Sequence, residues 1–378
     1  MRTMLKALKP IIIKEFRQIR RDPMSLGLLL FLPSALIILV GYALNFDVRH
    51  IPLAILDGSN TVQSRDFLKT FKQTEYFDHR FTVRSYDEID ELFTESLAKI
   101  ALVIPTTFAS DILAGRDTHV QILVDGSDNT TAGQALGYAV GLTSNYSSQL
   151  VAQTMARKGI KLYSPIDFRP RIWYNPDLAS SKFLVPGLIG SILMLTAVVS
   201  TALTVVREKE RGTMEQIMVS PLRSVELILG KTIPYMVIGL VTATLIIVLG
   251  YLLFDVQIRG SLLLLYGAVF ILLLGALGQG LLISTITNSQ QVAFMLAIFS
   301  SLLPSFLLSG FIFPISNMPI FLQVISNVAV NKFFLIVVRG IMLKGVGIPQ
   351  MWEQFVYMGI FACVTLGVSS LRLRKKSI

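Results

Sequence analysis

Cysteine and histidine are almost absent from this sequence of 378 residues. Cys363 is the only cysteine, and the histidines His50, His79 and His119 lie far apart along the chain. A single cysteine forms no intrachain disulfide and no cysteine-based metal site, and isolated histidines are typical surface residues. We therefore expect neither a disulfide framework nor a bound metal ion.

Charged residues are also scarce. They make up 15% of the chain, whereas a soluble protein usually carries about a quarter. The deficit is uneven, because long segments have no charge while residues 47–182 have the composition of a soluble sequence. The net charge of +10 would suit a nucleic-acid partner, but the excess cations lie beside apolar segments, as in membrane proteins. We therefore expect membrane lipids around most of the chain, one inserted soluble domain, and no nucleic acid.

Six apolar stretches are long enough to cross the hydrocarbon core of a bilayer, which is roughly 30 Å thick. None of them contains Asp, Glu, Lys, Arg or His. They are Leu26–Leu44, Leu184–Val206, Thr232–Phe254, Leu262–Ile286, Val292–Phe313 and Phe355–Leu371. A further apolar stretch, Ile320–Leu343, is interrupted by Asn327, Asn331, Lys332 and Arg339. We interpret it as re-entrant or interfacial helices and not as a seventh span.

The basic residues beside these stretches predict the orientation, since cytoplasmic flanks are enriched in Lys and Arg. Sixteen of them flank one side: Arg2, Lys6, Lys9, Lys14, Arg17, Arg20, Arg21, Arg207, Lys209, Arg211, Arg223, Lys231, Arg372, Arg374, Lys375 and Lys376. Four lie in the opposite short loops: Arg259, Lys332, Arg339 and Lys344. We predict a multi-pass protein of the bacterial inner membrane with both termini cytoplasmic. The first span, 24–45, is expected to stay uncleaved, with residues 46–183 periplasmic or extracellular and five more spans in 184–378.

The segment between the first two spans alternates strand and helix signals. Strands are predicted at Ile51–Leu56, Phe81–Val83, Ile100–Ile104 and Val120–Val124, with helical spacing between them and a long helix over about 131–158. This alternation predicts a small α/β domain.

Aspartates follow two of these strands, at Asp57, Asp125 and Asp128, where a ligand site could lie. Asp and Gly are ordinary turn formers, however, so we favour a structural role. No Ser-His-Asp spacing, catalytic carboxylate pair or phosphate loop is present.

The predicted spans offer no ionisable group for coupling to an ion gradient, which argues against a secondary transporter. Gly230-Lys231-Thr232 resembles the end of a phosphate-binding loop, but Val225 occupies the place of the first glycine. The driving force is thus expected to come from a partner. The loop 207–231 contains a short amphipathic turn, Met214–Val219, before Ser220-Pro221. It is either a docking handle for that partner or a solvated basic loop.

At this loop the chain resembles the permease subunits of type-2 ATP-binding-cassette (ABC) exporters, in the branch with a large extracytoplasmic domain after the first span. The match covers Glu208, Glu210, Arg211, Gly212, Thr213, Met214, Glu215, Pro221 and Gly230-Lys231. The resemblance implies that this segment is the coupling helix that contacts the ATPase subunit.

Other regions of the chain show the same resemblance. The N-terminal segment 1–23 is similar to the interfacial elbow helix of the family, through Lys14, Glu15, Arg17, Arg20 and Arg21. Residues 314–345, with the preceding turn, are similar to its re-entrant segment, through Gly310, Pro314, Pro319, Arg339 and Gly340. One departure is that Ala329-Val330 stands where members often have a proline.

The resemblance implies an α-helical polytopic membrane protein. It would have six transmembrane helices, an N-terminal interfacial helix, re-entrant helices between spans five and six, and an inserted α/β extracytoplasmic domain. It also implies a non-enzymatic subunit of an exporter, working with a second permease and two ABC ATPases that bind ATP and Mg²⁺. Uncharged walls favour a hydrophobic or amphipathic cargo, either drug-like or lipid-linked. Spans two and five would line the path, with the weak candidates Thr196, Ser200, Ser300 and Ser301.

Three alternatives stay open at this point. The outer domain could sense a ligand in a receptor or scaffold, an ion gradient could drive transport after all, or the chain could be a membrane enzyme without a visible nucleophile–base pair. Within the exporter interpretation, residues 46–183 could also bind a periplasmic or envelope partner.

Overall fold

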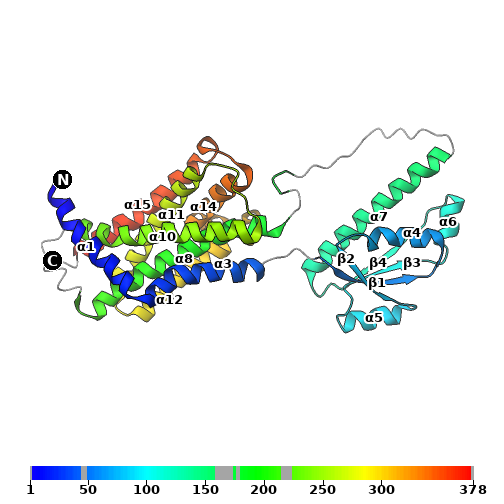
Figure 1. Cartoon of the computed structure of the whole chain (residues 1–378), viewed down its shortest axis with the longest axis horizontal. Helices are drawn as coiled ribbons and strands as arrows, with labels where there is room; N and C mark the ends of the chain where they lie inside the picture. Colours follow the sequence, from blue (N-terminus) through cyan, green and yellow to red (C-terminus); the bar gives the residue numbers. More distant parts are fainter. Residues whose placement is uncertain (1, 44–48, 158–172, 176–178, 214–223, 376–378) are drawn as a thin grey trace. The chain divides into compact units, whose positions relative to one another are not determined.

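The computed structural model describes residues 2–43, 49–157, 173–175, 179–213 and 224–375. It divides into two compact units, one formed by Met1–Asn45 and Arg171–Ile378 and the other by Phe46–Pro170. We call them the helical unit and the α/β unit (Figure 1).

Five helices of the helical unit are long and apolar enough to cross a membrane, within the part of the chain that the structure describes. They are α8 (Ser180–Glu210), α10 (Ser224–Phe254), α11 (Leu262–Ile286), α12 (Gln290–Leu303) with its continuation η2 (Pro304–Leu308), and α15 (Trp352–Lys375).

The first predicted span is helical but short. The chain runs from α1 (Arg2–Arg21) into α2 (Pro23–Leu26), the π-helical turn η1 (Gly27–Phe31) and α3 (Leu32–Ala43). Its apolar part is Leu29–Ala43, which is shorter than the other spanning helices. A sixth span therefore remains a prediction.

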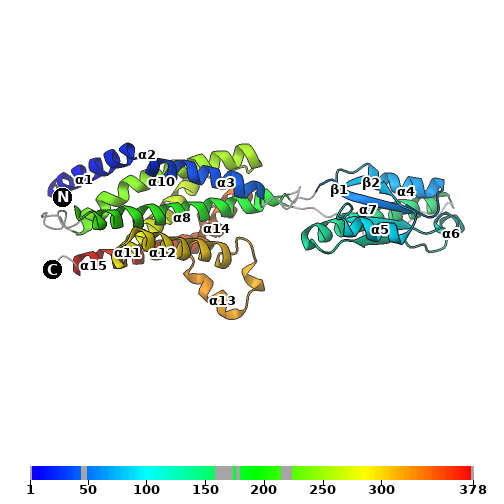
Figure 2. The same ribbon diagram turned by 90° about the horizontal axis from the view of Figure 1, so that it is seen from below.

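The helix α8 runs between α3 and α10 on one side and α11 and α12 on the other (Figure 2). Most of its residues between Leu184 and Val206 are apolar and buried, as expected for a helix in the centre of a membrane bundle. Small residues allow close approach. A Cβ added to Gly280 of α11 would lie 2.5 Å from the Val198 carbonyl of α8, and one added to Gly278 would lie 2.5 Å from the Thr365 hydroxyl of α15.

The stretch predicted to be re-entrant is a bent helix pair. The first arm contains α13 (Ile320–Ile325) and η4 (Ser326–Val328), and the second contains α14 (Val330–Arg339) and η5 (Gly340–Lys344). The arms meet at an angle of 85°, as in a broken span or a re-entrant loop. Ala329 is extended, with φ −78° and ψ 99°, so the chain breaks here without the proline that the family often has.

One predicted helix end is wrong. The fifth span was expected to reach Phe313, but the helix ends at Leu308, because Gly310 adopts a left-handed φ of +78° that the helix cannot accommodate. The charged loop, 207–231, includes the ends of two helices, since α8 continues to Glu210 and α10 already contains Lys231. Charged residues at both ends are paired, as described below.

The α/β unit is a four-stranded sheet in the order β2-β1-β3-β4. The strands are β1 (Ile51–Asp57), β2 (Phe77–Thr82), β3 (Ile100–Ile104) and β4 (Gln121–Val124), and β4 alone is antiparallel to its neighbour. They alternate with α4 (Val62–Lys72), α5 (Tyr86–Thr94), α6 (Phe108–Ala114) and α7 (Asn129–Arg157).

Helices cover both faces of this sheet (Figure 1). Residues of α4, α6 and α7 pack on one face around Phe67, Phe71 and Phe108, while Ile89 of α5 packs on the other. Alternate residues of β1 and β3 point into the two cores, as the period of two in a strand requires.

Candidate functional site

Four charged side chains join three helices at one end of the helical unit. We call Lys14, Glu15, Glu208 and Lys231 the ion-pair cluster, and this end of the unit the charged end. Lys231 Nζ lies 3.1 Å from Glu15 Oε1 and 2.6 Å from Glu208 Oε2. The second contact has the distance of an ion pair but not the angle of a hydrogen bond. Lys14 Nζ lies 2.5 Å from Glu208 Oε1 and 3.2 Å from Glu15 Oε1.

The cluster is electrically balanced and three of its four side chains are buried, whereas Lys14 is 47% exposed. The side chains of Glu15, Lys231 and Glu208 are 1%, 3% and 6% exposed. Charges this deep in a protein persist only when they are paired, so two cations and two carboxylates stabilise one another. Burial lowers the pKa of Lys14, but its hydrogen bond to Glu208 and the charges of both carboxylates outweigh burial and raise this pKa above its usual value.

The local sequence explains how the helices come close enough. A Cβ on Gly230 would lie 2.6 Å from Ile11 of α1, so only glycine lets α1 pack directly against the start of α10. The next residue, Lys231, then reaches Glu15. Gly230-Lys231 therefore serves helix packing at this position.

The end of α8 is tied to further elements. Arg207 donates to Asp22 at 3.0 Å and to Gln290 of α12 at 3.3 Å. Glu210 accepts from the backbone N–H of Gln290 at 2.7 Å, and Lys209 donates to the carbonyls of Ser284 and Thr287. Movement of the α8 terminus would thus be transmitted to α1, α10, α11 and α12.

The predicted coupling residues are placed in part. Glu208 and Glu210 make the contacts above, and Arg211 caps the helix end with its N–H on the Arg207 carbonyl. Gly212 is left-handed with φ +73°, and the Thr213 hydroxyl donates to the Glu208 carbonyl at 3.2 Å. Met214, Glu215 and Pro221 lie outside the described residues.

The predicted elbow residues all lie in α1, and they separate into groups. Lys14 and Glu15 belong to the ion-pair cluster. Arg17 and Arg21 line an open cleft of about 680 Å³ together with residues of the α8 end, whereas Arg20 is exposed and is not part of its lining.

Of the residues predicted for the re-entrant segment, Arg339 and Gly310 are joined by a hydrogen bond, while the others have separate roles. Its guanidinium donates to the carbonyls of Phe183 at 3.1 Å and Gly310 at 3.3 Å, and lies 3.7 Å from the centre of the Phe183 ring. A Cβ on Gly340 would lie 2.5 Å from the Met351 sulfur, so a larger residue here would have to displace the Met351 side chain. Pro314 and Pro319 cap the short helices η3 (Ile315–Asn317) and α13.

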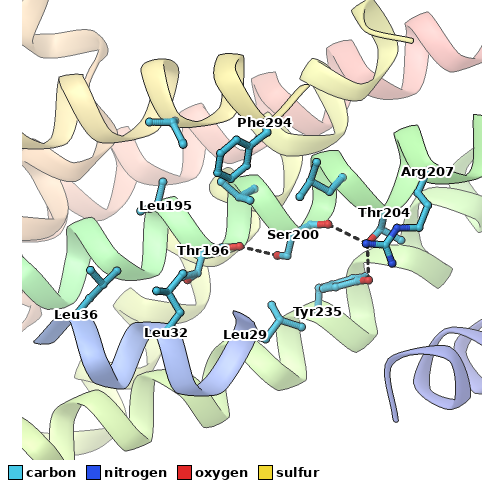
Figure 3. A pocket seen from close by; sticks show the side chains of 13 residues that line it. Leu29, Leu32, Leu36, Leu195, Thr196, Ser200, Thr204, Arg207, Tyr235 and Phe294 are labelled. Atoms are coloured by element: carbon cyan, nitrogen blue, oxygen red, sulfur yellow. Dashed lines mark hydrogen bonds between the residues drawn. The ribbon is translucent and has the colours of Figure 1, made fainter. Parts of the chain in front are cut away.

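An apolar cavity of about 300 Å³, which we call the apolar slot, lies between α3, α8, α10 and α12 (Figure 3). Thr196 and Ser200, two of the predicted path residues, line it. Their hydroxyls donate to the carbonyls of Ile192 at 2.8 Å and Thr196 at 2.6 Å. The lining residues are Leu29, Leu32, Leu36, Leu195, Thr196, Val199, Ser200, Leu203, Thr204, Arg207, Tyr235, Phe294 and Ile298.

The other two predicted path residues lie elsewhere. Ser300 and Ser301 line a second cavity of about 340 Å³, beside Gln279 and Asn331. Ser301 donates to its own helix at 2.6 Å, while Ser300 accepts from Gln279 at 3.0 Å. The four candidates therefore do not form one continuous lining.

Sequence reasoning missed the interhelical partners, Asp22, Lys231, Tyr235 and Gln290. Gly230-Lys231 was the one available signal, since a lysine directly before an apolar stretch needs a partner if the helix continues through it. No pattern in the sequence indicates that Tyr235 bonds Thr204 at 2.6 Å.

The aspartates of the α/β unit hold turns and helix starts. Asp57 accepts from the N–H groups of Ser59 and Asn60 and from the Ser64 hydroxyl, and Asp128 accepts from residues at the start of α7. Asp125 pairs with Lys99 at 2.7 Å. Among the described residues no cluster of His, Cys, Asp and Glu has the geometry to hold a metal ion.

Known proteins resemble the chain over nearly its whole length. The sequence profile of the ABC-2 family transporter proteins matches residues 24–371. The chain is 31% identical to the probable multidrug ABC transporter permease YbhS of Escherichia coli K12, over 98% of this chain and 97% of that protein. It is 28% identical to the probable multidrug ABC transporter permease YbhR of the same organism, over 99% and 100%. It is 27% identical to the inner membrane transport permease YhhJ, over 96% of both chains. The chain therefore belongs to the ABC-2 family of transporter proteins and is a transport permease.

Proposed function

We propose that this permease is the transmembrane subunit of an ATP-driven exporter. It would pair with a second permease and with two cytoplasmic ABC ATPases, which bind ATP and Mg²⁺, and would hydrolyse no nucleotide itself. The observation that carries the proposal is the ion-pair cluster, because it ties α1, α8 and α10 together next to the end of α8, where the predicted coupling residues begin. A push on those residues by a partner is thereby passed to the spanning helices.

The cargo we propose is hydrophobic or amphipathic, either a drug-like compound or a lipid. The apolar slot supports this class, since its walls are hydrocarbon and its hydroxyls bond within the protein. Two relatives carry the word multidrug in their names, which agrees with an apolar cargo.

The orientation we propose follows the positive-inside rule. Six spans, with α3 in the first, place the charged end and both termini in the cytoplasm of a bacterium. Residues 46–183 then lie on the periplasmic side of the inner membrane.

We also propose that the α/β unit binds a periplasmic or envelope partner. Its compact sheet and helices make a self-contained surface. Binding and release assays on residues 47–182 test this idea, and a lack of affinity for every envelope fraction would count against it.

The first test is affinity purification from detergent-solubilised membranes, comparing the wild type with Glu215→Arg. We expect an ABC ATPase to co-purify with the wild type and to be lost from the variant. Glu91→Arg makes the same charge change on an exposed position of α5 and is the matched control, for which full recovery is expected.

The rival functions predict other results. If no ATPase accompanies the wild type, the chain acts without one, and a receptor or ion-driven transporter replaces the exporter. Export that continues without the ATPase but stops when the proton gradient is collapsed would establish the ion-driven alternative.

A further inference from the structure

We propose that the apolar slot and the cleft lined by Arg17 and Arg21 beside it form one binding site for an exported amphiphile with one hydrocarbon chain and a phosphate head group of net negative charge. The chain lies in the slot and the phosphate lies in the cleft. This inference rests on the proposed exporter function and names its substrate class.

The slot fits hydrocarbon. Five of its thirteen lining residues are leucines from η1, α3 and α8, and Phe294 of α12 faces them (Figure 3). Its hydroxyl groups already have partners. Thr196 and Ser200 donate to their own helix, and Thr204 donates to the Ser200 carbonyl at 2.9 Å while bonding Tyr235. A polar group placed among these walls would lose its hydration without gaining a free partner.

The cleft has the opposite character. It is lined by Lys14, Arg17, Gln18, Arg21, Asp22, Pro23, Arg207 and Arg211, so five cations face one carboxylate. Lys14 is occupied by the ion-pair cluster and Arg207 by Asp22. Within the part of the chain that the structure describes, no carboxylate forms an ion pair with Arg17, Arg21 or Arg211. Guanidinium groups bind phosphate oxygens through paired hydrogen bonds, which makes phosphate the matching anion.

Arg207 connects the two spaces, because it lines both of them. It follows Thr204 of the slot by three residues, so about one helical turn separates the hydrocarbon wall from the cationic wall. In Figure 3 its side chain extends past Thr204 at the end of the slot. An amphiphile that spans this junction buries its chain and neutralises the arginines. A zwitterionic or cationic head on the same chain leaves them without a net anionic partner.

Binding of two lysolipids to the purified full-length chain in nonionic detergent tests the proposal. The probes are palmitoyl lysophosphatidylglycerol, which is anionic, and palmitoyl lysophosphatidylcholine, which has the same chain and no net charge. We expect the wild type to bind the anionic probe roughly tenfold more tightly, because the choline cation of the other probe neutralises its own phosphate and is repelled by the arginines. Equal affinities would overturn the proposal.

Three variants locate the site. Arg21→Gln should lose most of the preference for the anionic probe, and Ser200→Phe, which fills the slot, should weaken both probes alike. Arg20→Gln removes a neighbouring arginine that is exposed and is not part of the cleft lining, so it should bind as the wild type does. If Arg20→Gln reduces the preference for the anionic probe as much as Arg21→Gln does, a general basic surface explains the binding and the cleft does not.

The same preparation separates this inference from the exporter proposal. If an ATPase co-purifies and hydrolyses ATP but the two probes bind with equal affinity, the exporter proposal is supported and the amphiphile site is overturned. If the anionic probe is released when ATP is added to the complex, it behaves as cargo. If it stays bound throughout ATP turnover, it is a resident lipid, and the substrate assignment is overturned.

Discussion

At the scale of single residues, the buried ion-pair cluster is the feature with the clearest energetic consequence. Lys231 is the one cation deep inside it, and it serves two carboxylates. Removing one partner of a buried pair usually destabilises a protein by about 3–5 kcal/mol, because the remaining charge loses both water and counter-charge.

We therefore expect Lys231→Met to lower thermal stability in detergent strongly, with a loss in that range. The double variant Glu15→Gln/Lys231→Met should recover most of it, because the remaining Lys14 and Glu208 balance each other at 2.5 Å. Thermal unfolding followed by circular dichroism measures both. A single variant as stable as the wild type would mean that the cluster is well hydrated.

Asp125 supplies a pH dependence within the α/β unit. Its hydrogen bonds to Lys99 and Ser127 hold its pKa well below the usual value. The unfolded chain therefore takes up this proton more readily than the folded unit does. The resulting stabilisation is present above about pH 4, the ordinary range of an Asp, and is lost as the pH falls toward the folded pKa. Acid unfolding of a fragment covering Phe46–Pro170 should be less steep in Asp125→Asn, and an unchanged acid limb would contradict this role.

At the scale of elements, Arg339 holds the turn that follows η2. It donates to the carbonyls of Phe183 and Gly310, so two backbone acceptors depend on one side chain. We expect Arg339→Gln to raise amide hydrogen exchange at residues 309–313 roughly tenfold, because each orphaned carbonyl carries a penalty of about 1–3 kcal/mol when buried. Arg259→Gln removes an exposed arginine from a neighbouring loop and should leave the exchange unchanged. Equal exchange rates at these residues in both variants would show that the turn is stable without the hydrogen bonds of Arg339.

The helices and strands also show which element bounds can be predicted from the hydrophobic pattern of the sequence and which cannot. Ile51–Leu56 was expected as a strand and lies in β1, because a short apolar run before Asp-Gly has few alternatives. The apolar core of α11, Leu262–Ile286, was located to the residue, since Ser261 caps its start and Thr287 ends it. The helix end at Leu308 was misplaced, because Gly310 turns the chain there and its carbonyl accepts a hydrogen bond from the distant Arg339.

The candidate site divides in the same way. The resemblance to the type-2 exporters picked out Glu208, Glu210 and Arg339, which are charged residues beside or within apolar stretches. It could not pair Glu208 with Lys231, because that contact depends on how α1, α8 and α10 pack. Nor could it assign Thr196 and Ser300 to different cavities, as helix rotation decides which hydroxyls share a space.

At the scale of the whole molecule, the cluster separates two properties that usually change together: docking of the ATPase and transmission of its movement. Docking is proposed for residues 211–223, which include none of the four side chains of the cluster. Transmission needs α1, α8 and α10 to move as one body, and the buried charges tie them together.

The double variant Glu15→Gln/Lys231→Met therefore tests transmission of the movement separately from folding and from docking. It should remain folded and should still retain the ATPase in affinity purification. Substrate-stimulated ATP hydrolysis should nevertheless fall about fivefold or more, the lower range of typical coupling energies between distant sites. ATPase assays on the reconstituted complex measure this, with Glu91→Arg as the control. Full stimulation in the double variant would show that helix packing alone transmits the movement, so that the buried charges serve only stability.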